Sequence, residues 1–165
     1  MSAQATRTRA RLDWFPWLLL VLRVAMGLFF LMEAEHQIAS GYVGGDDLAM
    51  KLQKAADDTA IPGYRYLLEH VFIEIDQLLT VLVIAGEICV GVGLILGLFT
   101  RLTAAVAMFM NANFLLMNGT SLGASGVDLA FIAGEVLLFV YAGRQGLSVD
   151  GVLAQRGLSA RFMSA

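Results

Sequence analysis

The apolar residues of this chain are gathered into four long runs, separated by shorter polar segments. An α-helix that crosses a bilayer needs about 20 mainly apolar residues, and the four runs approach that length. The alternation of polar and apolar residues typical of membrane β-strands is absent, so a backbone in lipid has to satisfy its hydrogen bonds within helices. The pattern predicts four spanning helices, over residues 14–32, 77–99, 102–118 and 128–142.

Composition agrees with this pattern. The chain has 165 residues, of which 58% are hydrophobic and 15% charged. It is therefore too apolar for an ordinary soluble domain and too short for several domains. We predict an all-α integral membrane protein, with residues 1–165 forming a single membrane domain built as a four-helix bundle. Its main surroundings are the lipid bilayer, and nothing in the charge pattern favours nucleic acid.

The basic residues predict the orientation of the bundle. Positive residues in short loops stay on the cytoplasmic side of a membrane. Seven arginines fall on one side of the predicted bundle: Arg7, Arg9, Arg11, Arg101, Arg144, Arg156 and Arg161. We therefore expect a multi-pass protein with both termini in the cytoplasm. The first apolar run follows a basic stretch but has no small-x-small cleavage site, so we expect an uncleaved anchor rather than a signal peptide.

Residues 38–76 form the one long predicted segment outside the membrane. The stretch LAMKLQKAA predicts a short helix, which ends before Pro62-Gly63. Beyond that break, apolar residues again recur at helical spacing, from Leu67 to Ile75. This second stretch is either an amphipathic helix lying in the outer interface or an extension of the second spanning helix.

One strongly polar residue interrupts each predicted spanning helix. In helix order these residues are Arg23, Glu87, Asn111 and Glu135. Counted from the cytoplasmic end of each run, they lie about 15, 18, 15 and 12 Å deep. All four fall close to the membrane midplane, where a charge costs about 2.5–3.5 kcal/mol on insertion scales. We predict that they form one polar layer, which is the candidate site.

The charges in this layer do not cancel. Arg23 can neutralise one glutamate, and Asn111 can complete the hydrogen bonds of a structural ion pair that fixes how the helices meet. One carboxyl is then left over. It is either protonated or bound to a proton-carrying or cationic ligand, and such a carboxyl suits quinol oxidation, proton relay or coupled transport.

Two further pairs of residues change this picture in part. Asn111 and Asn113 lie two apart and face different sides of a helix, so we expect one of them to face the bundle. Gly93 and Gly97 form a GxxxG pair, which lets helices approach closely, either within the bundle or against a partner protein.

The two histidines, His36 and His70, both fall near the outer end of the predicted bundle. Two imidazoles at one level could hold a haem, and one could ligate a chlorin. The chain has no CxxCH motif and no histidine inside a predicted spanning helix, so we expect these residues to hydrogen-bond or titrate instead. No metal site is predicted, and the single cysteine, Cys89, excludes an intramolecular disulfide.

Three stretches together resemble the DoxX family, which includes DoxD, the small subunit of thiosulfate:quinone oxidoreductase. They are the run around Arg23 (LLLVLRVAMGLFFLMEAEHQ), the segment from Glu87 to Arg101 (EICVGVGLILGLFTR), and the segment from Met110 to Leu116 (MNANFLL). The resemblance implies a four-helix fold in the cytoplasmic membrane of a bacterium or archaeon. It also implies a link to thiosulfate-dependent quinone reduction or to membrane redox-stress complexes.

The sequence leaves three functions open. We expect first a membrane subunit of a redox complex, not a complete enzyme by itself, that works with other membrane or peripheral redox subunits. In this function the bundle binds quinone, Glu87 or Glu135 exchanges protons, and Arg23, Asn111 and Asn113 contact the ligand or hold the carboxylates. The alternatives are a non-catalytic accessory subunit of a respiratory or photosynthetic complex, and a small transporter or scaffold.

Overall fold

Every regular element in the part of the chain that the structure describes is a helix. The computed structural model describes residues 14–118, 122–142 and 148–155. In chain order the elements are α1 (Trp14–Ala39), α2 (Asp47–Asp58), α3 (Pro62–Leu67), the π-helix η1 (Leu68–Phe72), α4 (Asp76–Leu96), α5 (Thr100–Asn118), α6 (Leu122–Val140) and α7 (Val149–Gln155). The predicted all-α class is confirmed.

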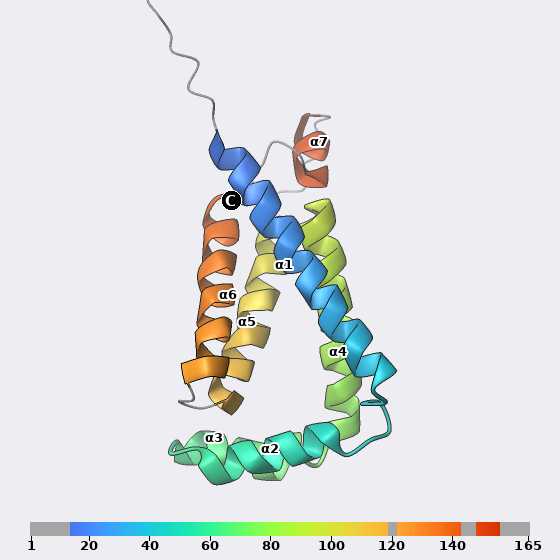
Figure 1. The fold of residues 1–165 in the computed structure, drawn as a ribbon, viewed down its shortest axis with the longest axis vertical. Coiled ribbons are helices and arrows are strands. Elements are labelled where there is room, and N and C mark those ends of the chain that lie inside the picture. Colours follow the sequence, from blue (N-terminus) through green and yellow to red (C-terminus); the bar gives the residue numbers. More distant parts are fainter. Residues whose placement is uncertain (1–13, 119–121, 143–147, 156–165) are drawn as a thin grey trace, which may run out of the picture.

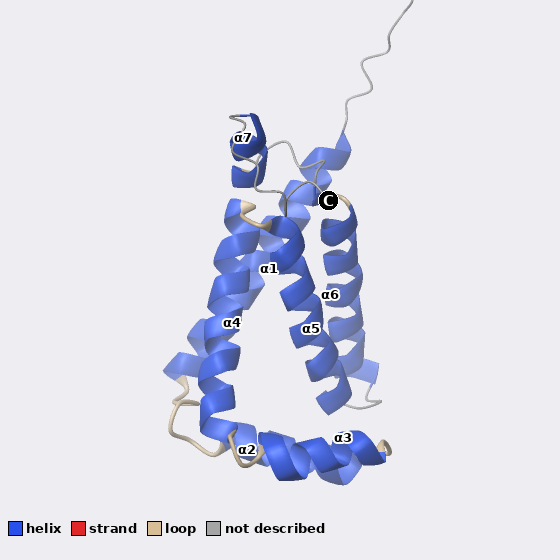
Figure 2. Ribbon diagram, turned by 180° about the vertical axis from the view of Figure 1, so that it is seen from behind, coloured by secondary structure: helices blue, strands red, loops and turns tan. Residues whose placement is uncertain are grey.

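The long helices form two pairs. α1 packs along α4, and α5 packs along α6. Figure 1 shows that the pairs lie close together near α7 and separate toward the opposite end, where α2 and α3 lie across the opening. The view from behind in Figure 2 shows α4 and α5 separating in the same way above α2 and α3. We refer to the two ends of the molecule as the α7 end and the α2 end.

Two glycines allow α1 and α4 to touch through their backbones. A Cβ atom on Gly27 would lie 2.8 Å from the carbonyl oxygen of Gly91, and one on Gly91 would lie 2.9 Å from that of Gly27. Both distances are shorter than carbon and oxygen allow, so only glycine fits at this crossing. The contact between Gly27 and Gly91 therefore defines the level at which α1 crosses the antiparallel α4.

Apolar side chains fill the space between the pairs toward the α7 end. Aromatic contacts join α1 to α6, since the ring of Phe131 lies 4.5 Å from that of Phe29 and 6.2 Å from that of Phe30, between centroids. The buried core residues are Leu19, Met26, Phe30, Val90, Leu94, Ala104, Ala107 and Leu138.

A second, smaller core attaches α2 to the bundle. Leu48, Leu52, Ala55 and Ala56 follow helical spacing and are buried, together with Leu68 of η1. Leu79 of α4 and Met117 of α5 pack against this cluster. The short helix predicted over LAMKLQKAA is thus present as α2, and it bridges the two helix pairs.

The segment after Pro62 is a separate element rather than an extension of the second long helix. α3 and η1 end at Phe72, and α4 begins at Asp76 in a different direction, as Figure 1 shows. Of the two possibilities raised by the sequence, the structure excludes the continuous helix.

Several helix ends differ from the predicted ranges. α1 continues from residue 32 to Ala39, and α6 begins at Leu122 rather than at residue 128. α4 ends at Leu96 and α5 begins at Thr100, where the predicted runs ended at 99 and began at 102. The predicted range of α1 stops just before the first acidic residue, Glu33, whereas the helix continues beyond it and buries Ala34.

Two of the described helices, α1 and α4, are long and apolar enough to cross a membrane. Their most apolar windows have mean hydropathies of 2.1 and 2.5. Six of the arginines on which the predicted orientation depends lie outside the described residues: Arg7, Arg9, Arg11, Arg144, Arg156 and Arg161.

At the α7 end, α4 turns sharply into α5. Gly97 has a φ of +65°, and the N–H groups of Gly97 and Leu98 donate to the carbonyls of Leu94 (3.2 Å) and Gly93 (2.9 Å). This is the Schellman pattern that commonly ends a helix at glycine.

Asp150 of α7 caps the next helix. Its carboxylate accepts bonds from the backbone N–H groups of Phe99 and Thr100, both at 2.8 Å, and from the Thr100 hydroxyl at 3.0 Å. A carboxylate at this position satisfies free N–H groups and favours the positive end of the helix dipole. A segment some fifty residues away in the chain thereby fixes the start of α5.

Candidate functional site

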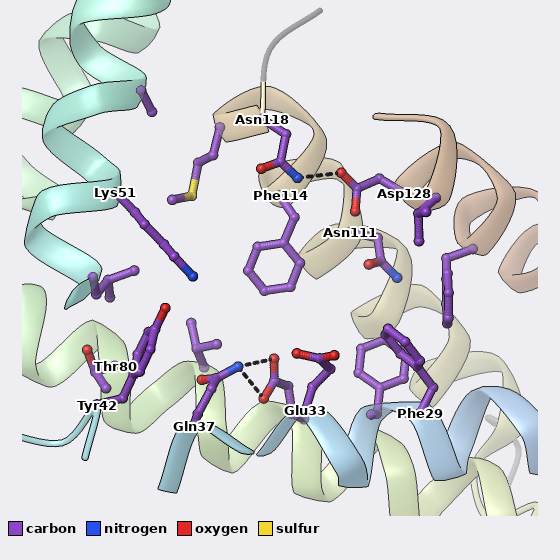
Figure 3. A pocket seen from close by; sticks show the side chains of 18 of the residues that line it. Phe29, Glu33, Gln37, Tyr42, Lys51, Thr80, Asn111, Phe114, Asn118 and Asp128 are labelled. Carbon is purple, nitrogen blue, oxygen red and sulfur yellow. Dashed lines mark hydrogen bonds between the residues drawn. The ribbon is translucent and has the colours of Figure 1, made fainter. Parts of the chain in front are cut away.

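A cavity of about 660 Å³ lies between the two helix pairs toward the α2 end. All five of the helices that meet there contribute to its wall, namely α1, α2, α4, α5 and α6. Figure 3 shows side chains from these helices pointing toward one another across the space. The cavity exists because the pairs diverge here and α2 closes the opening instead of filling it.

Glu87 of α4 is held at the cavity wall by Gln37 of α1. The Gln37 amide nitrogen donates to both carboxylate oxygens at 2.9 Å, and Figure 3 shows both bonds. Only 2% of Glu87 is exposed. A carboxyl this buried needs hydrogen-bond partners, and Gln37 supplies them.

Glu33 and Lys51 place further charge in the cavity. Glu33 lies one helical turn before Gln37 on α1, and Lys51 points into the cavity from α2 (Figure 3). The Lys51 ammonium lies 4.9 Å from the centroid of the Tyr42 ring, a cation–π arrangement. Glu33 and Lys51 thus bring side chains of opposite charge to the cavity that Glu87 lines.

On the opposite wall, Asn111 of α5 bonds to Glu135 of α6. The Asn111 amide nitrogen donates to Glu135 Oε1 at 2.5 Å. Glu135 is completely buried, and no donor among the described residues reaches its Oε2 atom. Asn111 itself lines the cavity and Glu135 does not. The amide therefore stands between the carboxyl and the cavity.

The remaining wall combines aromatic rings with one more polar pair. Phe29, Phe114 and Phe131 all line the cavity. Asn118 at the end of α5 donates to Asp128 of α6 at 2.8 Å, which ties these helices together beside the cavity (Figure 3). The cavity thus offers apolar ring faces together with amide and carboxyl groups.

Arg23 lies elsewhere in the structure. Its guanidinium is completely buried next to Gly97 at the α7 end, where a Cβ atom on Gly97 would overlap it, and Asp150 is the carboxylate that attracts it. Gly97 follows Glu87 by about 15 Å along the axis of α4. The predicted single layer is therefore divided into three places: Glu87 with Gln37, Asn111 with Glu135, and Arg23 with Asp150.

The other candidate residues lie outside the cavity. Asn113 donates to the carbonyl of Phe109, one turn back in its own helix, at 2.7 Å, so Asn111 is the asparagine that faces the bundle. His36 and His70 are exposed, and the His70 ring stacks on that of Tyr66 with 4.3 Å between centroids. Among the described residues, no group of three or more His, Cys, Asp or Glu side chains could hold a metal ion.

The GxxxG pair is used within the bundle. A Cβ atom on Gly93 would lie 2.8 Å from the Thr103 hydroxyl of α5, and Gly97 faces Arg23 of α1. This face is therefore covered by the chain's own helices, which leaves no place on it for a partner protein.

Gln37, Glu33 and Lys51 were not among the predicted site residues. Gln37 and Glu33 follow Phe30 at spacings of seven and three, so they share its face of α1. That spacing was the available signal, but it is visible only if the helix is continued past the first acidic residue. Lys51 could not be found in this way, because its place depends on how α2 docks.

Two apolar helices of membrane-spanning length are typical of a membrane protein. The cavity between the helix pairs, which combines aromatic rings with a few polar groups, is the candidate ligand site. Residues 18–118 match the DoxX family model, which is more than half of the chain, and the chain belongs to this family. The match covers Arg23, Gln37, Lys51, Glu87 and Asn111 and ends before Glu135. No curated protein and no solved structure matches the chain.

Proposed function

We propose that this protein is a membrane subunit of a redox complex and that it binds a quinone in the cavity between its helix pairs. One observation carries the proposal: a single cavity combines aromatic ring faces with the Glu87 carboxyl, the Asn111 amide and the Lys51 ammonium. Membership of the DoxX family supports the link to redox complexes. The partner that delivers or accepts electrons would be another subunit.

The cavity matches the chemistry of a quinone ring. Such a ring is planar and apolar on its faces, and it carries oxygen atoms that accept hydrogen bonds. Phe114 lies at the centre of the view in Figure 3 and offers a face on which a ring can stack. Asn111 and Lys51 offer N–H donors to the oxygens, and Glu87 is the carboxyl positioned to exchange a proton with the ligand.

We further propose that α5 and α6 also cross the membrane, which gives four spans with the α7 end in the cytoplasm. Each of these helices has 19 residues, close to the length that a span requires. Arg101, in the first turn of α5, favours a cytoplasmic location for the α7 end.

Single-cysteine labelling tests this topology. In a Cys89→Ser background, we expect a membrane-impermeant maleimide to label Ser40→Cys in intact cells and to label Arg101→Cys only after the membrane is permeabilised. Labelling of both positions in intact cells, or the reverse order, would contradict four spans with this orientation.

Quinone titration of the purified protein tests the binding proposal. The protein is purified in mild detergent, co-purifying chains are identified by mass spectrometry, and quinone binding is measured by calorimetry. We expect Glu87→Gln to remove quinone-dependent turnover by the complex while the unfolding temperature changes little. Asn113→Ala is the matched control, because Asn113 is a polar residue of the proposed span α5 that does not line the cavity. Equal loss of fold and activity in Glu87→Gln would instead identify a structural carboxyl.

A further inference from the structure

Two amide–carboxyl pairs lie on opposite sides of the cavity, and they present different groups to it. On the α1–α4 side, both Gln37 and Glu87 line the cavity. On the α5–α6 side, only the amide of Asn111 lines it, and Glu135 lies behind. A ligand in the cavity can thus touch a carboxyl on one side and an amide on the other.

Glu135 has no direct access to the cavity. Glu135 is 0% exposed, and its Oε1 atom accepts a hydrogen bond from the Asn111 amide. No described residue donates to its second oxygen. The hydrogen-bonded route from Glu135 to a ligand in the cavity therefore runs through Asn111.

The bond to Glu135 determines what Asn111 can offer. A side-chain amide has a donor end and an acceptor end that exchange places when the group rotates by half a turn. Because the carboxyl accepts from Nδ2, that rotation is disfavoured. One N–H of Nδ2 is used, and the second N–H and Oδ1 remain for the cavity.

We propose that Glu135 is a positioning residue that holds Asn111 against the bound ligand, whereas Glu87 is the carboxyl that meets the ligand itself. This inference rests on the proposed quinone function. It assigns different roles to Glu87 and Glu135, for which the sequence alone predicted the same role in proton exchange. It also implies that the ligand is contacted at two opposite ends, by the Asn111 amide on one wall and by the Glu87 carboxyl on the other.

A double-mutant cycle tests whether Glu135 acts through Asn111. We expect Asn111→Ala to weaken binding of a 1,4-naphthoquinone about tenfold, the loss of about one hydrogen bond. Glu135→Met, which keeps length but removes the acceptor, should weaken it about threefold to tenfold. The double variant should bind no more weakly than Asn111→Ala alone, because the bond that Glu135 supports is already gone.

A conservative replacement separates positioning from proton exchange. Glu135→Gln retains a carbonyl oxygen that can accept from Asn111, so binding and its pH profile should stay close to wild type. Glu87→Gln should change the pH profile, although Glu33 of α1 and Lys51 of α2, the charged groups that face Glu87, are still present. Unfolding temperatures measured alongside show whether each variant is folded.

The possible outcomes are distinct. If wild-type protein binds no quinone, the proposed function fails. If it binds quinone but the losses from Asn111→Ala and Glu135→Met add, Glu135 does not act through Asn111 and the inference is wrong. A Glu135→Gln variant with a changed pH profile would likewise overturn it, since Glu135 would then exchange the proton itself. If Glu135→Met does not fold, the comparison of Glu135→Gln with Glu87→Gln still decides.

Discussion

Gln37 holds Glu87 by donating one amide nitrogen to both carboxylate oxygens, at 2.9 Å each, across fifty residues of sequence. The bond joins α1 to α4 at the edge of the cavity. Nearer the α7 end the same two helices touch at Gly27 and Gly91. The pair is therefore held by backbone contact at one level and by a polar bond at another, which fixes the Glu87 carboxyl at the cavity wall.

Replacing Gln37 by leucine should leave this carboxyl buried without a donor. Hydrogen bonds to charged groups contribute about 1.5–3 kcal/mol, so we expect a loss of that order in equilibrium unfolding measured in mixed micelles. Asn113→Ala is the control, because its bond lies within one helix turn. A Gln37→Leu variant as stable as this control would show that the bond contributes little.

Asp150→Ala should destabilise the α7 end. The change removes the cap of α5 and the carboxylate that attracts the buried Arg23. The loss of a cap alone costs about 1–2 kcal/mol, measured as free energy of unfolding. Asp57→Ala serves as the comparison, because Asp57 is exposed and, among the described residues, accepts its hydrogen bond from Gln53 of the same helix. Stability equal to that of Asp57→Ala would mean that α7 does not hold the turn.

Alanine at three glycines should give three different results. Gly97→Ala combines a positive φ with overlap on Arg23 and should cost about 2 kcal/mol or more. Gly91→Ala should separate α1 from α4, because its Cβ would meet Leu31 at 2.7 Å. Gly126→Ala in α6 meets nothing within 4 Å and should gain up to about 1 kcal/mol. Unfolding of the three variants in parallel measures this order, and a stable Gly97→Ala would contradict the close contact with Arg23.

Tyr64 should make the protein sensitive to strongly alkaline pH. Burial raises the pKa of its phenol above the ordinary value of 10.0. The neutral form is thus favoured in the folded state, and its contribution is fully present below about pH 10 and is lost as the pH rises through the folded pKa. Tyr64→Phe should reduce this loss. The difference between the two unfolding curves at pH 9 to 11 isolates the phenol from other groups that titrate there, and identical curves would refute its role.

Much of the helical architecture could be predicted from apolar spacing. The long helices follow from the length of the apolar runs, and α2 follows from the helical spacing of its buried residues, so the existence of these helices could be predicted from pattern alone. Glu87, Asn111 and Glu135 could also be chosen in advance, because a polar residue within an apolar helix is costly unless it is buried with a partner. The structure places these three at or behind one cavity.

The partners of these residues could not be predicted from the depth of each residue in its own helix. Partners also depend on how far neighbouring helices are shifted along one another. Counting from the helix ends put Arg23 level with Glu87. In the structure Gly27 lies beside Gly91, so Arg23 is level with the end of α4 near Gly97. Glu87 is instead bonded by Gln37, a residue farther along α1 that reaches it through its long side chain. The first turns of α1 extend beyond the end of α4, as Figure 1 shows, and this offset depends on packing rather than on hydropathy.

The double role of α2 restricts how its sequence can change. One face of this helix closes the cavity through Lys51, and the neighbouring face is anchored by Leu52. Inserting one residue within the helix would turn everything beyond it by about 100°. Insertions in the glycine-rich segment before Asp47 leave that register intact. Length variation in this part of the chain should therefore be tolerated outside the twelve residues of α2 and not within them.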